Sequence, residues 1–475
     1  MGTLEQILIG AIAVFLPAVV IFLAVLILRE HRPPSSTMVW ILAIILLPYV
    51  GIPLYLIIGG YRFRRDRHRK PRLYDHPHLT TRELPGVVAD DDRLRDLTDQ
   101  LHAAGLPLPT GGNKVELVAR GDEAFGRLVE MIRGAKRSIY VEMFILGRDD
   151  VGQAIVDELA AKAKDGVRVR LLLDGLGALF SQYRFSKPLR KAGGKVGTFS
   201  PIWPPRPGRT RHMHMRNHRK IIVVDEREAM VGGMNLAHEY MGPDHVASEW
   251  YDAMAAVRGP AVRDFLRIFD ADWRFATKED IEFETVPAPA TGGEDAVQVL
   301  AGGPDAEFLP LHDMLVSAMR VARRRVWIAT PYFVPSEPMM RQIRLLAEMG
   351  RDVRVVVPKV SNHRIPDMAR NSYFRQLRGS KVRLFTYTGG MLHSKLMLID
   401  EAVCVIGSAN MDIRSLFFNF EAGALVYSRG VAQQVEATIQ MYMDGSEAVD
   451  DRRPERESLA LEIVEDIARL MAPLL

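Results

Sequence analysis

The sequence predicts an α/β protein of two similar halves, preceded by a two-helix transmembrane hairpin at the N-terminus. A polar pattern, His-x-Lys-x-x-x-x-Asp, occurs twice, at residues 218–225 and 393–400. Strand-like and helix-like segments alternate in the same order before each copy, which is typical of α/β domains. Long uncharged apolar segments stand at the N-terminus. With 475 residues, 48% of them hydrophobic, the chain can form two or three domains with sizeable cores.

The first 60 residues are expected to cross a membrane twice. Residues 7–28 and 38–58 contain no charged side chain, and about 20 apolar residues are enough to span a bilayer. A cleaved signal peptide is the alternative for the first segment. However, that segment has no basic region before it, and no small-residue cleavage site precedes the second. We therefore assign residues 1–60 to a transmembrane hairpin.

Basic residues indicate the orientation of this hairpin. Residues 61–72 are rich in arginine, whereas the short loop between the spans contains Arg29 and Arg32. The positive-inside rule therefore places the rest of the chain in the cytoplasm. We assign residues 61–110 to a basic juxtamembrane segment and linker. Its charges could attract anionic lipid headgroups or serve only to set the topology.

The remaining chain divides into two halves with the same order of elements. Residues 111–283 form the first half, and residues 297–475 form the second, which ends in a C-terminal helix. The connection, ETVPAPATGGEDA at residues 284–296, is rich in proline and glycine. Two such halves facing each other across a pseudo-two-fold axis would combine two half-sites into one active site.

Each polar pattern is predicted to form a β-hairpin. In HRKIIVVD, His218 and Lys220 stand two residues apart before a β-branched run, so both side chains leave the same face of a strand. Asp225 follows at a turn position, which favours a structural role in the hairpin. The second copy, HSKLMLID, repeats these positions with His393, Lys395 and Asp400.

A glycine and an asparagine follow each pattern at matching distances, Gly232 with Asn235 and Gly407 with Asn410. Two imidazoles on opposite sides of a phosphodiester could act as nucleophile and acid, while lysine and asparagine bind its charged oxygens. The alternative is a duplicated hairpin whose polar residues are only turn and surface groups. Recurrence of five residue types at fixed offsets argues against this alternative.

Two HxKxxxxD motifs, each followed by GxxN, resemble the phospholipase D superfamily. The N-terminal hairpin, RNHRK around the first motif and NMDIRSLFFNFE after the second narrow the resemblance to the bacterial cardiolipin synthase family. The resemblance implies two α/β/α halves and reversible phosphatidyl transfer between two phosphatidylglycerol molecules. Cardiolipin and glycerol would form through a phosphatidyl-histidine intermediate, with no cofactor and no metal ion.

The resemblance also implies roles for individual residues. The motif residues would be catalytic: His218, Lys220, Asp225, His393, Lys395 and Asp400. Of the two histidines, the first is favoured as the nucleophile because superfamily members often use the N-terminal motif for attack. Asn235 and Asn410 would bind the substrate phosphate.

Members of the family place an acidic residue downstream of each motif to orient the histidine. The resemblance therefore implies Asp252, in SEWYD, as the partner of His218, and Glu421, in FNFE, as the partner of His393. Each acid could instead be a surface residue at the end of a strand.

Other functions remain open at this point. A membrane-bound phospholipase D that hydrolyses phospholipids to phosphatidic acid would use the same histidine intermediate. A nuclease fits poorly with the membrane spans, and a non-catalytic membrane scaffold fits poorly with two intact motifs. The expected partners are phosphatidylglycerol and the bacterial inner membrane, with no nucleic acid. The sequence leaves open the second lipid donor, the acyl preference and a homo-oligomeric state.

Three further features carry weaker expectations. Cys404 is the only cysteine, so no intrachain disulfide can form, and its apolar neighbours predict a core position. His212, His214 and His218 are closely spaced, but no adjacent carboxylate or thiolate completes a metal site. The basic loop 200–218 could receive anionic lipid or be merely solvated.

The C-terminal residues 459–474 have the apolar periodicity of an amphipathic helix. Its polar face is acidic, with Glu462, Glu465 and Asp466. An anionic membrane would repel these charges, so we expect the helix to dock on the catalytic part instead.

Overall fold

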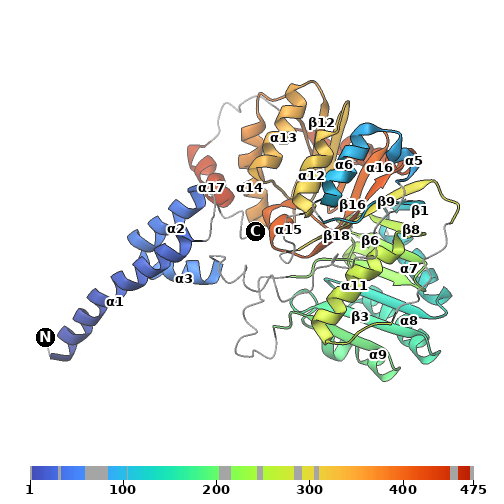
Figure 1. Cartoon of the computed structure of the whole chain (residues 1–475), viewed down its shortest axis with the longest axis horizontal. Coiled ribbons are helices and arrows are strands. Elements are labelled where there is room, and N and C mark those ends of the chain that lie inside the picture. Colours follow the sequence, from blue (N-terminus) through green and yellow to red (C-terminus); the bar gives the residue numbers. More distant parts are fainter. Residues whose placement is uncertain are drawn as a thin grey trace. The chain divides into compact units, whose positions relative to one another are not determined.

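The computed structural model describes residues 3–29, 34–58, 84–103, 105–202, 216–242, 250–282, 291–303, 310–449 and 458–470. The chain forms two compact units, Met1–Pro71 and Arg72–Leu475 (Figure 1). The predicted basic segment 61–72, most of the basic loop 200–218, and residues 284–290 of the predicted linker lie outside the described residues.

The N-terminal unit contains the helices α1 (Thr3–Leu28), α2 (Pro34–Leu46) and α3 (Pro48–Ile58). The predicted second span, 38–58, is divided between α2 and α3. The division falls at Leu47, because a residue before proline disfavours the helical conformation, whereas Pro48 suits the first position of the next helix. Within the described segments, no helix combines the length and apolar character needed to cross a membrane. The transmembrane hairpin therefore stays a prediction.

The second unit is built on one sheet of 15 strands. In the first half the strands run in the order β1-β8-β6-β5-β2-β3-β4, and in the second β9-β18-β16-β15-β10-β12-β13-β19. The halves join where β1 and β9 pair antiparallel. Moving outward from this seam, equivalent strands follow in the same order on both sides, as a two-fold axis at the seam would produce. The predicted α/β fold of two similar halves is confirmed.

The first half begins with β1 and ends with α11. Its strands β2 and β5 are fully buried, because helices cover both faces of this part of the sheet. Figure 1 shows α7, α8 and α9 on this half. The elements are β1 (Thr110–Val118), α7 (Gly121–Gly134), β2 (Ser138–Met143), α8 (Asp150–Lys164), β3 (Arg168–Asp174), η2 (Ser181–Phe185), α9 (Lys187–Lys191), β4 (Lys195–Phe199), β5 (Ile221–Val224), β6 (Glu228–Gly232), α10 (His238–Met241), β7 (Trp250–Tyr251), β8 (Met254–Arg258) and α11 (Val262–Thr277).

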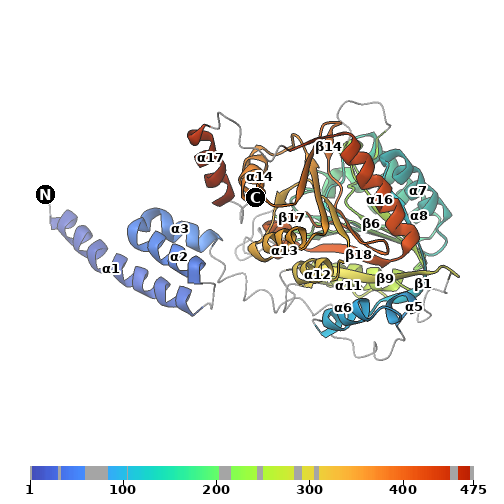
Figure 2. The same cartoon turned by 90° about the horizontal axis from the view of Figure 1, so that it is seen from above.

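The second half repeats this arrangement, with α12, α13 and α14 beside its strands and α16 along the sheet (Figures 1 and 2). Cys404 is buried in β16, as predicted. The elements are β9 (Asp295–Gly302), α12 (Pro310–Arg320), β10 (Arg325–Ala329), β11 (Phe333–Val334), α13 (Glu337–Glu348), β12 (Asp352–Pro358), α14 (Arg364–Leu377), β13 (Arg383–Tyr387), β14 (Met391–Leu392), β15 (Leu396–Ile399), β16 (Val403–Gly407), β17 (Met411–Asp412), α15 (Ile413–Phe417), β18 (Glu421–Tyr427), α16 (Arg429–Asp444), β19 (Ser446–Ala448) and α17 (Leu459–Leu470).

Part of the predicted juxtamembrane linker belongs to the core of the second half. Residues 84–103 contain α5 (Gly86–Ala89) and α6 (Asp92–Ala103). The apolar face of α6, with Leu94, Leu97 and Leu101, is buried in the same hydrophobic cluster as α12 and β10. The sequence analysis assigned these residues to the linker and missed this helix. Its leucines nevertheless have the spacing of an amphipathic helix, between strongly charged residues.

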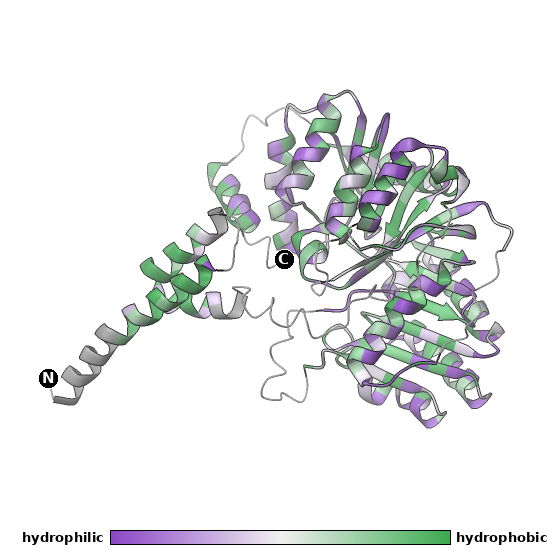
Figure 3. Ribbon diagram, viewed as in Figure 1, coloured by the Kyte–Doolittle hydropathy of each residue, from purple (hydrophilic) through white to green (hydrophobic). Residues whose placement is uncertain are grey.

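The C-terminal helix α17 docks on α14, but not through the face that its periodicity suggests. Its buried residues are Glu465 and Ala468, whereas Ile463 and Ile467 are about half exposed. Figure 3 colours α17 with both hydrophobic and hydrophilic bands. The expected docking on the catalytic part is therefore found, with the polar face turned inward.

Candidate active site

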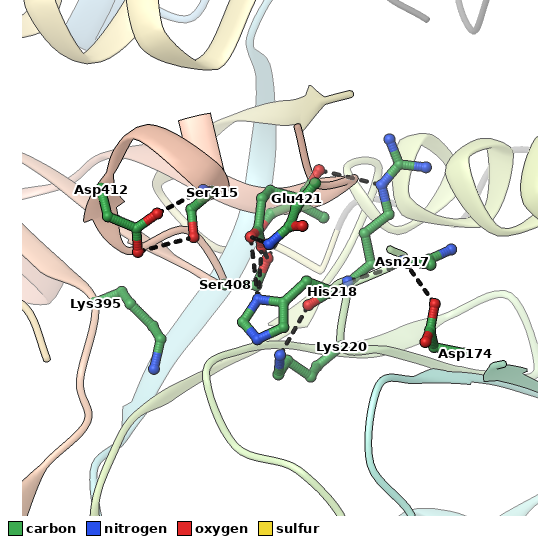
Figure 4. A network of polar contacts seen from close by, with 12 residues as sticks. Asp174, Asn217, His218, Lys220, Lys395, Ser408, Asp412, Ser415 and Glu421 are labelled. Carbon is green, nitrogen blue, oxygen red and sulfur yellow. Dashed lines mark hydrogen bonds and ion pairs between the residues drawn. The ribbon is translucent and has the colours of Figure 1, made fainter. Parts of the chain in front are cut away.

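The first motif enters the site directly before β5. The backbone N–H of His218 donates to the Phe420 carbonyl at 2.9 Å, so the second half holds the start of this motif. The Lys220 ammonium donates to the His218 carbonyl at 2.8 Å, and its side chain is fully buried (Figure 4). The Phe144 ring lies against the imidazole, with ring centroids 4.8 Å apart. Few rotamers are open to His218 in this setting.

The second motif is held in the same way by the first half. The backbone N–H of His393 donates to the Tyr251 carbonyl at 2.7 Å. This contact continues the parallel pairing of β14 with β7. The Lys395 ammonium donates to the His393 carbonyl, and the rings of Tyr240 and Trp250 enclose the imidazole.

The two motifs form one site. Both ammonium groups, Lys220 and Lys395, act electrostatically on each imidazole and lower the pKa of His218 and His393. Figure 4 shows the Lys395 side chain pointing toward His218 and Lys220. Two cationic and two imidazole side chains from different halves are therefore gathered within a small volume.

The carboxylates that pair with the histidines come from the opposite halves, so the predicted pairing is wrong. His218 Nδ1 lies 3.0 and 3.1 Å from the two oxygens of Glu421. His393 Nδ1 lies 2.5 Å from Asp252 Oδ2. The reason is that the two halves exchange backbone hydrogen bonds at the site. His218 bonds to Phe420, directly before Glu421, and His393 bonds to Tyr251, directly before Asp252.

Burial dominates the electrostatics of the imidazoles. Desolvation lowers the pKa of His218 and takes the pKa of His393 to about 3. Burial alone would raise the pKa of both carboxylates. Instead, His218 and Lys220 hold the pKa of Glu421 below its usual value. Lys395 and His393 do the same for the pKa of Asp252. Neutral imidazoles that donate Nδ1–H to ionised carboxylates leave Nε2 as a lone-pair donor.

The two lysines are also perturbed. Burial lowers the pKa of Lys220 to about 7, and the Lys395 ammonium contributes in the same direction. The pKa of Lys395 is lowered by burial too, while Asp252, 3.2 Å away, opposes that change. A phosphodiester anion between the two lysines would stabilise their charged forms.

Asp225 and Asp400 have the structural role in the hairpin that their turn positions predict. Their carboxylates bond to backbone N–H groups, so their grouping with the catalytic residues, which the resemblance implies, gains no support from the contacts. Each stands at the far end of its strand with φ near +50°. The Asp225 carboxylate accepts the backbone N–H groups of residues 136–138 at 2.7–2.9 Å. The Asp400 carboxylate accepts those of residues 323–325 in the same way. Both acids tie the motif hairpin to the start of a neighbouring strand.

The two asparagines are buried but differ in their contacts. Asn235 Oδ1 accepts the backbone N–H of Ile145 at 3.1 Å. The Asn410 amide donates to the Asp412 carboxylate, and its Oδ1 is buried with no hydrogen-bond partner. The predicted binding of phosphate by these amides stays a prediction.

Residues outside the motifs complete the site, and the sequence analysis missed them. Ser408 donates to Glu421 Oε2 at 2.5 Å, which adds a second hydrogen bond to the acid that holds His218. The equivalent position in the first half is Gly233, where a Cβ atom would lie 2.1 Å from Asp252 Oδ1. The sequence does contain a sign of this difference: GGMN follows the first motif, whereas GSAN, with Ser408, follows the second. The two half-sites are therefore unequal.

Arg219, the middle residue of the first HxK, anchors the motif from the other face of the strand. Its Nε donates to the Glu421 carbonyl at 3.1 Å, and its guanidinium pairs with the buried Asp272. In the second motif Ser394 takes this place, and its hydroxyl donates to the Tyr251 carbonyl at 3.1 Å. Both residues bind the strand segment that carries the opposite half's carboxylate.

For the part of the chain that the structure describes, no three His, Cys, Asp or Glu side chains are grouped so that they could hold a metal ion. His212 and His214 lie outside the described residues. The expectation of metal-free chemistry therefore stays a prediction.

Comparison with known proteins identifies the family. A family model described as "Cardiolipin synthase, PLD-like domain" matches residues 128–273 and 315–443, and a model described as "Phospholipase_D-nuclease N-terminal" matches residues 18–60. The fold also resembles the crystal structure of phosphatidylserine synthase from Haemophilus influenzae Rd KW20, with a TM-score of 0.57 and 18% identity. The match covers 81% of this chain and 98% of that one.

Relatives named cardiolipin synthase match nearly the whole chain. The protein of Geobacillus sp. (strain WCH70) is 32% identical over 98% of this chain and 94% of its own length. Cardiolipin synthase 1 of Bacillus anthracis is 32% identical over 94% of this chain and 90% of its own. With both halves matched by the family model and full-length relatives at this identity, the chain belongs to the cardiolipin synthase family of PLD-like proteins.

Proposed function

We propose that the protein is a cardiolipin synthase that transfers a phosphatidyl group from one phosphatidylglycerol to another and releases glycerol. The observation that carries this proposal is the crossed site, in which two HxK pairs from different halves meet and each imidazole is held by the other half's carboxylate. Such a site suits a two-step exchange at one phosphorus atom.

In the first step, His218 Nε2 attacks the phosphorus of the donor lipid. A P–N bond forms, the bond from phosphorus to the glycerol oxygen breaks, and His393 gives that oxygen a proton. Glu421 keeps the His218 proton on Nδ1 and stabilises the positive charge that develops on the ring. His218 is the more accessible imidazole, with 13% of its side chain exposed against 6% for His393.

His393 must carry a proton when the donor is bound. Burial and the nearby Lys395 ammonium hold its pKa at about 3. A phosphodiester would add a negative charge next to this imidazole and offset part of the effect of the Lys395 charge. Both changes raise the pKa of His393. Substrate binding would thus favour the protonated form of His393 that the reaction needs.

Lys220 and Lys395 would bind the non-bridging oxygens of the phosphodiester, with Asn235 and Asn410 at their margin. Both ammonium groups are buried, so each attracts an anion more strongly than an exposed lysine would. Their charge also stabilises the additional negative charge in the pentacoordinate transition state.

In the second step, a hydroxyl of another phosphatidylglycerol enters in place of glycerol. His393, now neutral, takes the hydroxyl proton, the oxygen attacks phosphorus, and the bond to His218 breaks. If water entered instead, the product would be phosphatidic acid, which is the activity of the alternative phospholipase D.

The proposal includes a bacterial inner-membrane location, with the N-terminal hairpin in the bilayer and the catalytic unit on the cytoplasmic side. The uncharged segments 7–28 and 38–58 support the hairpin. The match of residues 18–60 to the N-terminal family model gives further support. The partners would be phosphatidylglycerol and the membrane, with no nucleic acid.

Mass spectrometry of lipids tests the function. Purified full-length protein is incubated with phosphatidylglycerol vesicles, with the His218→Ala and His393→Ala variants as matched controls. We expect cardiolipin and glycerol in equal amounts from the wild type and neither product from the variants. Phosphatidic acid as the main product would instead support hydrolysis.

A further inference from the structure

The C-terminal helix α17 is attached to the catalytic unit by its polar face. Glu465, almost fully buried, accepts from the Asn371 amide at 2.8 Å and forms an ion pair with Arg375. Asp466 accepts from the Ser372 hydroxyl at 2.6 Å and pairs with the same guanidinium at 2.8 Å. The carboxylates of Glu465 and Asp466 are thus directed toward α14, where both pair with the Arg375 guanidinium.

The opposite face of α17 is aliphatic and exposed. A helix on a globular protein ordinarily buries its apolar stripe and leaves its charges in water. Here the arrangement is reversed: the described residues of the unit Arg72–Leu475 leave much of the stripe exposed. At about 100° per residue its members lie on one side of the helix: Leu459 (70% exposed), Ile463 (51%), Val464 (44%), Ile467 (53%) and Leu470 (75%).

The chemistry of this stripe fits lipid better than protein. It contains no aromatic, methionine or arginine side chain, which are the residues enriched at the centre of protein interfaces. Its charged neighbours, Glu465 and Asp466, are paired with Arg375, so the repulsion that an anionic headgroup layer would exert on them is reduced. Helices that lie in a membrane surface bury such an apolar face at the boundary of headgroups and acyl chains and usually carry a basic polar face. In α17 the pairing of Glu465 and Asp466 with Arg375 takes the place of that basic face.

The N-terminal end of α14, the helix that holds α17, is linked to the second half-site. The segment before and at the start of α14 exposes two more aliphatic residues, Val360 (73%) and Ile365 (42%). Between them, Asn362 accepts from the Tyr332 hydroxyl at 2.5 Å. Tyr332 directly precedes β11, which pairs with β17, and β17 begins one residue after Asn410. The segment that begins α14 is therefore linked to the loops of the second half-site, and it exposes Val360 and Ile365.

We propose that α17 lies in the surface of the phospholipid bilayer, with the stripe from Leu459 to Leu470 among the acyl chains. This contact would seat the second half on the membrane, in addition to the N-terminal hairpin, and bring the active site to the depth of the lipid phosphates. The choice of a bilayer as the occupant rests on the lipid substrate given under the proposed function.

A fluorescence experiment on the full-length protein tests this contact. Cys404 is the only cysteine and is buried, so an introduced cysteine can be labelled selectively. Ile463→Cys, with NBD attached, is reconstituted in vesicles of phosphatidylglycerol and phosphatidylethanolamine that contain lipids spin-labelled near the headgroup. Gln433→Cys, on the exposed surface of α16, is the matched control.

We expect the label at residue 463 to lose most of its fluorescence to the spin-labelled lipid, and the label at residue 433 to lose little. Equal, weak quenching at both positions would overturn the proposal. So would energy transfer between donor- and acceptor-labelled copies at residue 463 without quenching by lipid, because a second copy would then cover the helix.

A second variant separates this inference from the proposed function. In Ile463→Asp/Ile467→Asp, cardiolipin formation on vesicles should fall severalfold, while turnover of detergent-dispersed phosphatidylglycerol stays near the wild-type rate. Equal rates for variant and wild type on vesicles would count against the contact. A wild type that forms no cardiolipin from either substrate would refute the function, and lipid quenching at residue 463 would still decide the position of α17.

Discussion

Replacing Glu421 with glutamine should slow the attack of His218 without unfolding the site. The carboxylate is fully buried and accepts from His218 Nδ1 at 3.0 Å and from the Ser408 hydroxyl at 2.5 Å. Glutamine has nearly the same shape, but only one of its two terminal atoms accepts hydrogen bonds. If the Ser408 bond keeps the oxygen, the amide NH₂ faces the imidazole and donates to Nδ1. The ring proton then moves to Nε2, the atom that has to attack.

The size of the effect follows from two contributions. A hydrogen bond to a charged group contributes about 1.5–3 kcal/mol, which corresponds to roughly 10- to 150-fold in rate. A wrong imidazole tautomer costs more: replacing the acid beside a catalytic histidine by its amide lowers kcat by about 10⁴ in a serine protease. We therefore expect formation of the phosphatidyl-enzyme to be slower by between about 10² and 10⁴.

The matched variant is Asp252→Asn, which makes the same change beside His393. The assay uses a phosphatidyl donor with a good leaving group, which needs no acid, followed by rapid quench and peptide mapping. Asp252→Asn should still load phosphatidyl on His218 at nearly the wild-type rate, yet fail with phosphatidylglycerol. Glu421→Gln should fail with both donors.

The opposite pattern would refute this reasoning. If Asp252→Asn blocks loading and Glu421→Gln permits it, with the adduct on His393, then the second motif attacks and the roles of the histidines are exchanged. If the adduct stays on His218 in that pattern, the crossed pairing of acids and imidazoles does not operate in the working enzyme.

Three further perturbations have definite expected outcomes. Because the pKa of Lys220 is lowered to about 7, its ammonium is lost as pH rises through that value, so kcat/KM should fall on the alkaline side; a constant value up to pH 9 would contradict this. Asp225→Asn should lower the free energy of unfolding by about 1–3 kcal/mol, seen as a lower Tm, because the carboxylate accepts three backbone N–H groups. The folded enzyme should keep its activity. A normal Tm with abolished activity would assign Asp225 a chemical role. In Gly233→Ala the new Cβ would displace the Asp252 carboxylate, so activity should fall by more than about tenfold. The control Gly126→Ala, in open space on α7, should keep full activity. Equal activity of the two variants would show that Asp252 needs no fixed position.

Local pattern determined much of this protein. The β-branched run after His218 and the apolar run after Lys395 are buried strands because each contains only residues that suit a sheet covered on both faces. The two-residue spacing within HxK places imidazole and ammonium on one face of a strand. Repetition of the motif, a property of the sequence alone, already indicated two half-sites.

Local sequence patterns could not predict which acid pairs with which histidine. Asp252 lies closer in sequence to His218, and Glu421 closer to His393, yet each acid serves the other histidine. Sequence proximity predicts contacts within a hairpin, whereas these contacts form between halves that meet at the β1–β9 seam. The partner of each imidazole therefore depends on how two complete domains pack.

The same distinction applies to α17. The periodicity of α17 shows that it has two faces, but which face is buried depends on what α14 offers. Because α14 presents Asn371, Ser372 and Arg375, the acidic face is held by hydrogen bonds and ion pairs and the aliphatic face stays outside. Helical periodicity is a local property of the chain, while the choice of the buried face is an interaction energy between elements that are distant in sequence, and only the tertiary structure decides it.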